Sequence, residues 1–142
     1  MALVEDLIPE RTILILIPDY RFGEPCGDFS QRNRERNYLE TSASSMFVYF
    51  LYKLVRNGIL TGQPAETARG AAKAGYSSLV KKMLREEPSG ELHLAGICSV
   101  AGLGGDPYRD GSFDYYVKEP VVEDDFKGAG PFILASMESE QA

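Results

Sequence analysis

The sequence predicts a mainly α-helical protein with a small two-stranded β element, and three observations lead to this prediction. A long apolar stretch without turn residues follows residue 41. An amphipathic segment comes next, with apolar side chains three and four residues apart. Two short stretches nearer the C-terminal end then alternate apolar and polar residues, which is the two-residue period of half-buried strands.

The composition is that of one ordinary globular domain. The chain has 142 residues, and 44% of them are hydrophobic, which is enough to build a core. A net charge of −6 argues against nucleic acid as a partner, because affinity for phosphates depends on lysines and arginines. Two cysteines and one histidine do not complete a usual zinc ligand set, so we expect free thiols and no metal. No apolar stretch is long enough to cross a membrane, and we expect a cytoplasmic protein.

Residues 1–36 form an N-terminal segment to which we assign no role. Within it, Thr12 to Ile17 is uncharged and rich in β-branched residues, which favours a buried strand, with an aggregation-prone segment as the alternative. Residues 18–28 are rich in aspartate, glycine and proline and are typical of a loop.

The first predicted helix covers residues 42–57. Every residue from Met46 to Tyr52 is apolar or aromatic, which indicates a helix inside a helical assembly. Thr41 or Ser42 can cap its start, and Asn57 with the following glycine is a good stop.

The second predicted helix covers residues 64–86. Pro64 suits a first helical turn, and the apolar residues from Ala68 to Met83 fall on one side of the helix. The opposite side is basic and polar. This pattern predicts an outer helix that packs on the first one.

The predicted β element pairs residues 92–100 with residues 112–117. Residues 101–111 between them are too many for a tight hairpin, so they form a loop that projects from the body. The glycines at 102–105 precede this proline-containing loop instead of a helix, so they are no dinucleotide fingerprint, and we expect no cofactor. Proline is tolerated in a first helical turn, so Gly130-Pro131 predicts the start of a last helix at 129–138.

The amino-acid sequences of two segments resemble those of a known family. They are NYLETSASSMFVYFLYKLVRNGIL, which starts at Asn37, and CSVAGLGGDPYRDGSFDYYVKEPVVEDDFKGAGPFILA, which starts at Cys98. Both resemble the C-terminal part of the unsaturated rhamnogalacturonyl hydrolases, a glycoside hydrolase family related to the unsaturated glucuronyl hydrolases. The resemblance covers residues 37–137, and residues 1–36 do not share it.

The resemblance implies an (α/α)6 barrel, and the predicted inner, outer and inner helices match one slice of such a barrel. A complete barrel demands well over about 200 residues. We therefore expect a partial, barrel-like fragment of about three helices with a two-stranded β element. We assign residues 37–142 to one domain, which is the C-terminal part of an (α/α)6 glycoside hydrolase-like domain.

The family removes an unsaturated uronic acid from pectin-derived oligosaccharides. Its general-acid aspartate lies earlier in the barrel, and no position of this chain matches it. We assign no catalytic residue and expect the chain alone to be inactive, because glycoside hydrolysis usually needs a carboxylic acid beside a second carboxylate. Spacing alone leaves five carboxyl groups available: Asp106, Asp110, Asp114, Asp124 and Asp125.

Three substrate-binding candidates lie where the chain leads into the first helix. Thr41, Ser42 and Ser45 offer hydroxyls at the positive end of a helix, which favours the carboxylate of an unsaturated uronic acid. The alternative is that these side chains cap the helix and pack tightly.

Two further candidates lie in the projecting loop. Tyr108 offers an aromatic face for a sugar ring, and Arg109 offers a guanidinium for the uronate carboxylate. The alternative is an ion pair between Arg109 and Asp110 or Asp114 that holds the loop.

A second function is a non-catalytic interaction or assembly module. Only one long outer helix is available to cover the apolar helix at 42–57, so a large apolar surface is left over. In this hypothesis the exposed barrel edges pair with a second copy or with a complementary chain.

Overall fold

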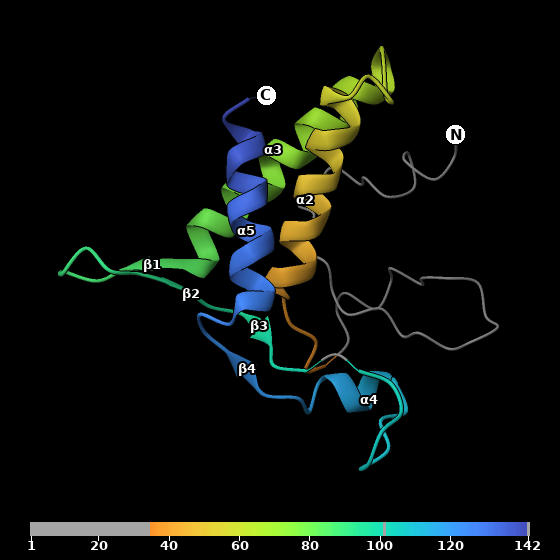
Figure 1. Ribbon diagram of the computed structural model, residues 1–142, viewed down its shortest axis with the longest axis vertical. Coiled ribbons are helices and arrows are strands. Elements are labelled where there is room, and N and C mark those ends of the chain that lie inside the picture. The colour runs from red at the N-terminus through yellow and green to blue at the C-terminus, as the bar shows by residue number, and fades with distance from the viewer. Residues whose placement is uncertain (1–34, 101, 142) are drawn as a thin grey trace.

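The computed structural model describes residues 35–100 and 102–141 (Figure 1). The strand and loop predicted at residues 12–28 lie outside the described residues. The described elements are α2 (Thr41–Arg56), α3 (Gln63–Met83), β1 (Leu84–Glu86), β2 (Leu92–Leu94), β3 (Ile97–Cys98), α4 (Phe113–Tyr116), β4 (Val121–Val122) and α5 (Phe126–Ser139).

The three long helices form the body of the described chain. Helices α2 and α5 lie side by side and run in the same direction, and α3 runs the opposite way and packs against both (Figure 1). The core between them is made of buried side chains from all three: Val48, Leu51, Tyr52, Ala68, Ala71, Ala72, Leu79 and Ala135. This arrangement confirms the predicted mainly helical fold.

Helix α2 has the bounds expected within one residue, but its cap is different. Glu40 is the N-cap, and its side chain accepts a hydrogen bond of 2.7 Å from the backbone N–H of Ala43. The prediction that Thr41 or Ser42 caps the helix is wrong. Thr41 is already helical, and its hydroxyl donates to the carbonyl of Ala95 at 2.6 Å.

The expected strand at 92–100 is divided in two at Gly96. Gly96 has a φ of 79°, and a Cβ added to it would lie 2.7 Å from Thr41 Oγ1. The turn therefore needs glycine, and it ends β2 and begins β3. Strand β1 directly follows α3 and pairs antiparallel with β2. Strand β3 pairs antiparallel with β4.

The prediction of a strand at 112–117 is wrong, because these residues form the short helix α4. Ser112 caps it, and the Ser112 hydroxyl oxygen accepts a hydrogen bond of 3.1 Å from the N–H of Tyr115. The buried side chains are Phe113 and Tyr116, which are three residues apart as one helix face requires. The alternating pattern was misleading because the side chain of Tyr115 is only partly buried.

Helix α5 begins at Phe126, earlier than expected. Asp125 is the N-cap and accepts a hydrogen bond of 2.8 Å from the N–H of Lys127. Pro131 lies inside the helix, so the prediction that it marks the start is wrong. The Asp125 cap decides the start, and Pro131 inside the helix leaves the carbonyl of Lys127 without its usual backbone donor.

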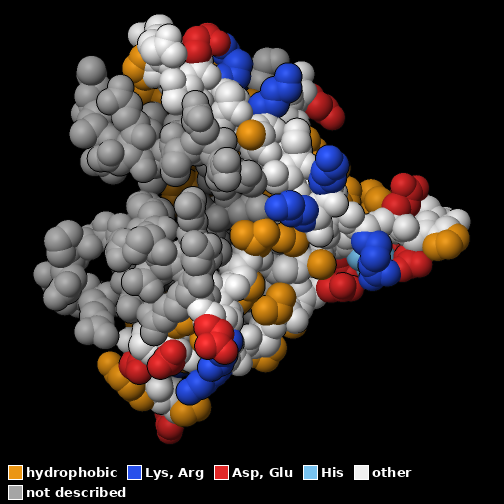
Figure 2. All heavy atoms as spheres, turned by 180° about the vertical axis from the view of Figure 1, so that it is seen from behind, with side chains coloured by type: hydrophobic (Ala, Val, Ile, Leu, Met, Phe, Trp, Pro, Cys, Tyr) orange, Lys and Arg blue, Asp and Glu red, His pale blue; other side chains and the backbone are white. Residues whose placement is uncertain are grey.

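Charged side chains are spread over several parts of the face seen in Figure 2. The β1–β2 hairpin projects from the body and carries both acidic and basic residues. At the C-terminal ends of α2 and α5, Glu138 is buried and accepts hydrogen bonds of 2.7 and 2.9 Å from Arg56, with Lys53 at 3.4 Å. Among the described residues, no helix is long and apolar enough to span a membrane.

Candidate functional site

The candidate site lies at the end of the molecule where α2 and α5 both begin. Strands β3 and β4, helix α4 and the loop around residues 102–111 gather at this end (Figure 1). The five predicted binding residues all belong to this end, three at the start of α2 and two in the loop.

Glu40 organises the start of α2, and the sequence analysis missed it. Its side chain is almost fully buried and accepts hydrogen bonds from Ala43 N at 2.7 Å, Ser42 Oγ at 2.9 Å and Cys98 N at 3.0 Å. The carboxyl group thus joins α2 to β3. The available signal was an acidic residue directly before the helix, a position at which carboxylates complement the helix dipole.

The three hydroxyl candidates on α2 all donate hydrogen bonds within this chain. Thr41 and Ser45 are fully buried, and their hydroxyls donate to Ala95 O at 2.6 Å and Thr41 O at 2.7 Å. Ser42 is partly exposed and donates to Glu40. These contacts agree with the packing part of the alternative interpretation, whereas Glu40 is the cap. Substrate binding by these residues stays a prediction.

Arg109 is held in a fixed position by the glycine-rich part of its loop. Arg109 and Gly104 exchange two backbone hydrogen bonds of 2.8 and 3.1 Å, and Arg109 Nε donates to Gly104 O at 3.1 Å. A Cβ added to Gly102 would lie 3.0 Å from Arg109 Nη1, and one added to Gly105 would lie 2.7 Å from Nη2. The guanidinium therefore lies close to the backbone of Gly102 and Gly105.

The side chains around Arg109 have separate partners. Asp110 accepts a hydrogen bond of 2.9 Å from Ser112 N, which is the main cause of the lowered pKa of Asp110. Tyr108 next to Arg109 is 79% exposed. Among the described residues, no hydrogen bond or ion pair joins Tyr108 or Arg109 to Thr41, Ser42 or Ser45, so the candidates form two groups at one end of the molecule.

Tyr38 lies beside Cys98 beneath this end. Its hydroxyl is buried and has no hydrogen-bond partner of normal geometry among the described residues. Burial, and then the neighbouring Cys98 thiol, raise the pKa of Tyr38 well above its usual range.

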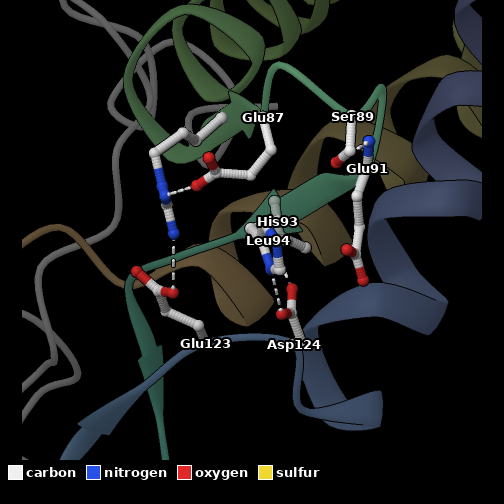
Figure 3. A network of polar contacts seen from close by, with 8 residues as sticks. Glu87, Ser89, Glu91, His93, Leu94, Glu123 and Asp124 are labelled. Atoms are coloured by element: carbon white, nitrogen blue, oxygen red, sulfur yellow. Dashed lines mark hydrogen bonds and ion pairs between the residues drawn. The ribbon is translucent and has the colours of Figure 1, made fainter.

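Asp124 joins the β1–β2 hairpin to the start of α5 (Figure 3). Its carboxylate contacts His93 Nδ1 at 2.7 Å and accepts from Leu94 N at 2.8 Å, and its own N–H donates to Leu94 O at 3.0 Å. Beside it, Arg85 Nη2 donates to Glu123 at 3.2 Å. Asp124 and the N-cap Asp125 thus have structural partners that join β2 and α5.

The same end offers no metal centre within the described residues. No group of three or more histidine, cysteine, aspartate or glutamate side chains lies close enough together there to hold an ion. The groups that the candidate residues offer at this end are a guanidinium, an aromatic ring and hydroxyls.

Most of this chain is similar in sequence to known proteins. Residues 29–142 match Glycosyl Hydrolase Family 88, a range that starts upstream of residue 37. The chain is 48% identical over 105 residues to Protein Atu3128 of Agrobacterium fabrum, and has the same identity to the 24.9 kDa protein in picA locus of Rhizobium radiobacter. Both alignments cover 72% of this chain and 45% of the relative.

A solved structure shares the fold. It is the glycoside hydrolase from family 105 of C. acetobutylicum ATCC 824, with 49% identity and a TM-score of 0.70. The match covers 77% of this chain and 29% of that one, so this chain spans less than half the length of each of these relatives. The chain belongs to Glycosyl Hydrolase Family 88.

Proposed function

We propose that this chain is the C-terminal part of an unsaturated rhamnogalacturonyl hydrolase-like protein, and that it supplies one wall of a cleft for an unsaturated uronic acid. Family membership supports a glycosyl hydrolase origin. The substrate class follows from the resemblance of residues 37–137, and a cytoplasmic location is part of the same proposal.

The observation that carries the proposal is the position of Arg109. Its Nε is used by Gly104 O, and its Nη atoms have no hydrogen-bond partner among the described residues. A guanidinium held in this way presents a planar pair of donors that suits a carboxylate bound through both oxygens. Because the side chain is already ordered, binding loses little side-chain entropy.

Neighbouring side chains complete a uronide-binding wall. Tyr108, the residue before Arg109, presents an exposed aromatic ring, which suits the face of a sugar. Of the three hydroxyl candidates on α2, Ser42 is partly exposed and can contact a ligand without disrupting the helix start. Thr41 and Ser45 support it from the buried side.

The chain alone is proposed to bind its ligand weakly and to leave it uncleaved. No residue matches the general acid of the family, and one wall neither excludes water nor orients a sugar. A dissociation constant of about 1 mM or weaker is expected for such an open site.

The test is a titration of the full chain with an unsaturated uronic acid–rhamnose disaccharide, followed by backbone NMR. Shifts centred on Tyr108 and Arg109 are expected in the parent chain and are lost in Arg109→Lys. Arg69→Lys is the matched control, because Arg69 is an exposed arginine on α3 that pairs with Glu66 at 2.7 Å. Equal shifts in Arg109→Lys and the parent chain would refute the assignment.

Activity is followed in the same samples by the absorbance of the substrate double bond. No loss of absorbance is expected. Turnover that disappears in Asp110→Asn or Asp114→Asn would show that this chain carries a catalytic carboxylate of its own.

The second candidate function is a non-catalytic assembly module. The exposed apolar side chains of α2 and α5 favour it, because they suit contact with another polypeptide. A chain that associates through these helices, but gives no NMR shifts with the disaccharide, would make association the function and sugar binding incidental.

A further inference from the structure

The hydroxyl groups at the start of α2 all donate their hydrogens to acceptors within the chain. Four residues in the first turns of the helix carry such a group: Thr41, Ser42, Ser44 and Ser45. Three of the hydroxyls donate to backbone carbonyl oxygens at 2.6 or 2.7 Å. Ser42 donates to the side chain of Glu40 instead, and its Oγ lies 2.9 Å from both carboxylate oxygens. A hydroxyl group has one hydrogen, so none of the four has a hydrogen left for a ligand.

Two backbone donors at the same helix start are also used within the chain. The N–H of Thr41 donates to Gly96 O at 2.8 Å, and the N–H of Ala43 donates to Glu40 Oε2 at 2.7 Å. A helix start attracts anions because its first N–H groups have no partner inside the helix. That attraction is reduced at α2, since two of these groups already have acceptors.

Glu40 places a buried negative charge at this point. Its side chain is only 4% exposed, and its carboxylate also accepts a hydrogen bond of 3.0 Å from Cys98 N. The groups that contact this carboxylate are two backbone N–H groups and one hydroxyl, and all three act as donors to it. A second carboxylate placed against Ser42 would lie one hydroxyl group away from a like charge that water screens poorly, which is unfavourable.

Ser42 and Arg109 therefore offer opposite hydrogen-bonding groups. Ser42 is partly exposed, and because its hydrogen is directed to Glu40, its oxygen can only accept from a ligand. A neutral sugar hydroxyl is a donor of this kind, whereas a carboxylate has no hydrogen to give. The guanidinium of Arg109 is the reverse case, since it has donors and no acceptor.

We propose that Glu40 determines the orientation of the ligand at this end of the molecule. Its buried charge excludes a carboxylate from the start of α2 and makes Ser42 an acceptor for a sugar hydroxyl, so the carboxylate is bound by Arg109. This inference rests on the proposed function and names the part of the uronide that each group of candidate residues recognises. Glu40 is a positioning residue in this proposal, because it acts through Ser42.

The experiment compares the unsaturated uronic acid–rhamnose disaccharide with its methyl ester, by NMR titration of the full chain. Esterification removes the charge of the carboxylate and should weaken binding to the parent chain by roughly tenfold. Ser42→Ala should weaken the binding of both forms alike by roughly threefold, because one neutral hydrogen bond is lost, so the effect of esterification stays the same. In Arg109→Gln, the acid and the ester should bind almost equally.

Two features of the chain make Ser42→Ala a clean variant. The hydrogen bonds from Ala43 N and Cys98 N to Glu40 do not involve Ser42, so the helix cap is retained. Ser78→Ala is the matched control, because Ser78 is a partly exposed serine on α3, and it should change the affinity for neither form.

Acetate gives a second readout, because it is a carboxylate without hydroxyl groups. In the parent chain, acetate should shift the amide signals around Arg109 and leave those of Ser42 and Ala43 unchanged. Glu40→Gln removes the negative charge, so acetate should then shift the Ser42 and Ala43 signals as well. A purely structural role of Glu40 does not predict this gain of anion binding.

The outcomes separate this inference from the proposed function. An effect of esterification that shrinks in Ser42→Ala would place the carboxylate at Ser42 and overturn the inference. Acetate shifts at Ser42 that are the same in Glu40→Gln and the parent chain, or equally absent from both, would also overturn it. Disaccharide binding that depends on Arg109 but not on Ser42 refutes the inference and leaves the proposed function standing. An effect of esterification that persists in Arg109→Gln, together with acetate shifts gained in Glu40→Gln, refutes the proposed function and supports the role of Glu40.

Discussion

The helical body and the end that carries the candidate site are held together by different interactions. In the body, the best-buried side chains are apolar, such as Val48, Leu79 and Ala135, and they contact residues from other helices. At the site end, single polar side chains fix the shape through backbone groups, as Glu40 and Arg109 do. The difference indicates that the body determines whether the chain folds, whereas the site end determines where the binding residues lie.

The largest loss of stability should come from a cavity in the core of the helical body. Leu79 is fully buried, and Leu79→Ala should lower the free energy of unfolding by about 2–4 kcal/mol, through lost burial and a residual cavity. Val80→Ala is the control, because Val80 on the same helix is 37% exposed. Urea unfolding measures both. Equal losses would mean that α3 is not packed as described.

Removing the Glu40 side chain should lower the free energy of unfolding somewhat less than Leu79→Ala does. The effect should lie at the boundary between the helical body and the site end. Glu40→Ala removes the helix cap and leaves the N–H of Cys98 without its acceptor, so a loss of about 2 kcal/mol is expected. Hydrogen exchange should speed up at the amides of Ala43 and Cys98. Glu40→Gln keeps an acceptor oxygen and should recover part of the loss, and unchanged exchange in Glu40→Ala would contradict this role.

Glu138 stabilises the helical body through a polar interaction, its ion pair with Arg56. Glu138→Gln should lower the free energy of unfolding by about 1–2 kcal/mol at pH 7, a modest value because Arg56 is partly exposed. The hydrogen bond from Arg56 lowers the pKa of Glu138, so its contribution is present above the unfolded pKa of about 4.3 and is lost as pH falls through the folded pKa. The difference in free energy of unfolding between parent and variant should therefore shrink at pH 3, as urea unfolding at both pH values would show.

The smallest effect is expected at the pair formed by His93 and Asp124. The hydrogen bond to Asp124 raises the pKa of His93, so this contribution is complete below about pH 6.5 and is lost as pH rises through the folded pKa. The N–H of Leu94, and then His93, lower the pKa of Asp124, whose contribution is present above about pH 3.9 and lost at lower pH. Both contributions are thus present between about pH 4 and 6.5.

NMR titration of the His93 ring checks this pair directly. Asp124→Asn should move the His93 pKa down towards its ordinary value. Glu123→Gln is the comparison, because Glu123 pairs with Arg85 and leaves the His93 contact in place. The same downward shift in both variants would mean that general surface charge, and not the Asp124 contact, sets the pKa.

The two regions also differ in how well the sequence predicts them. Helices α2 and α3 begin within one residue of their predicted starts, because apolar periodicity over many residues has one structural solution. At the site end, residues 112–117 alternate like a strand but fold as α4. A run of six residues matches both periods, and the Ser112 cap decides between them.

By itself, the sequence determined the helical class, the order of the long helices, the family resemblance and the position of Tyr108 and Arg109 in one loop. Each of these depends on residues that are close together in the chain. Only the tertiary structure decided that Glu40 bonds to Cys98 and that Thr41 lies against Gly96. These contacts join residues far apart in the chain, which meet only after the elements have packed, and no local pattern specifies such a meeting.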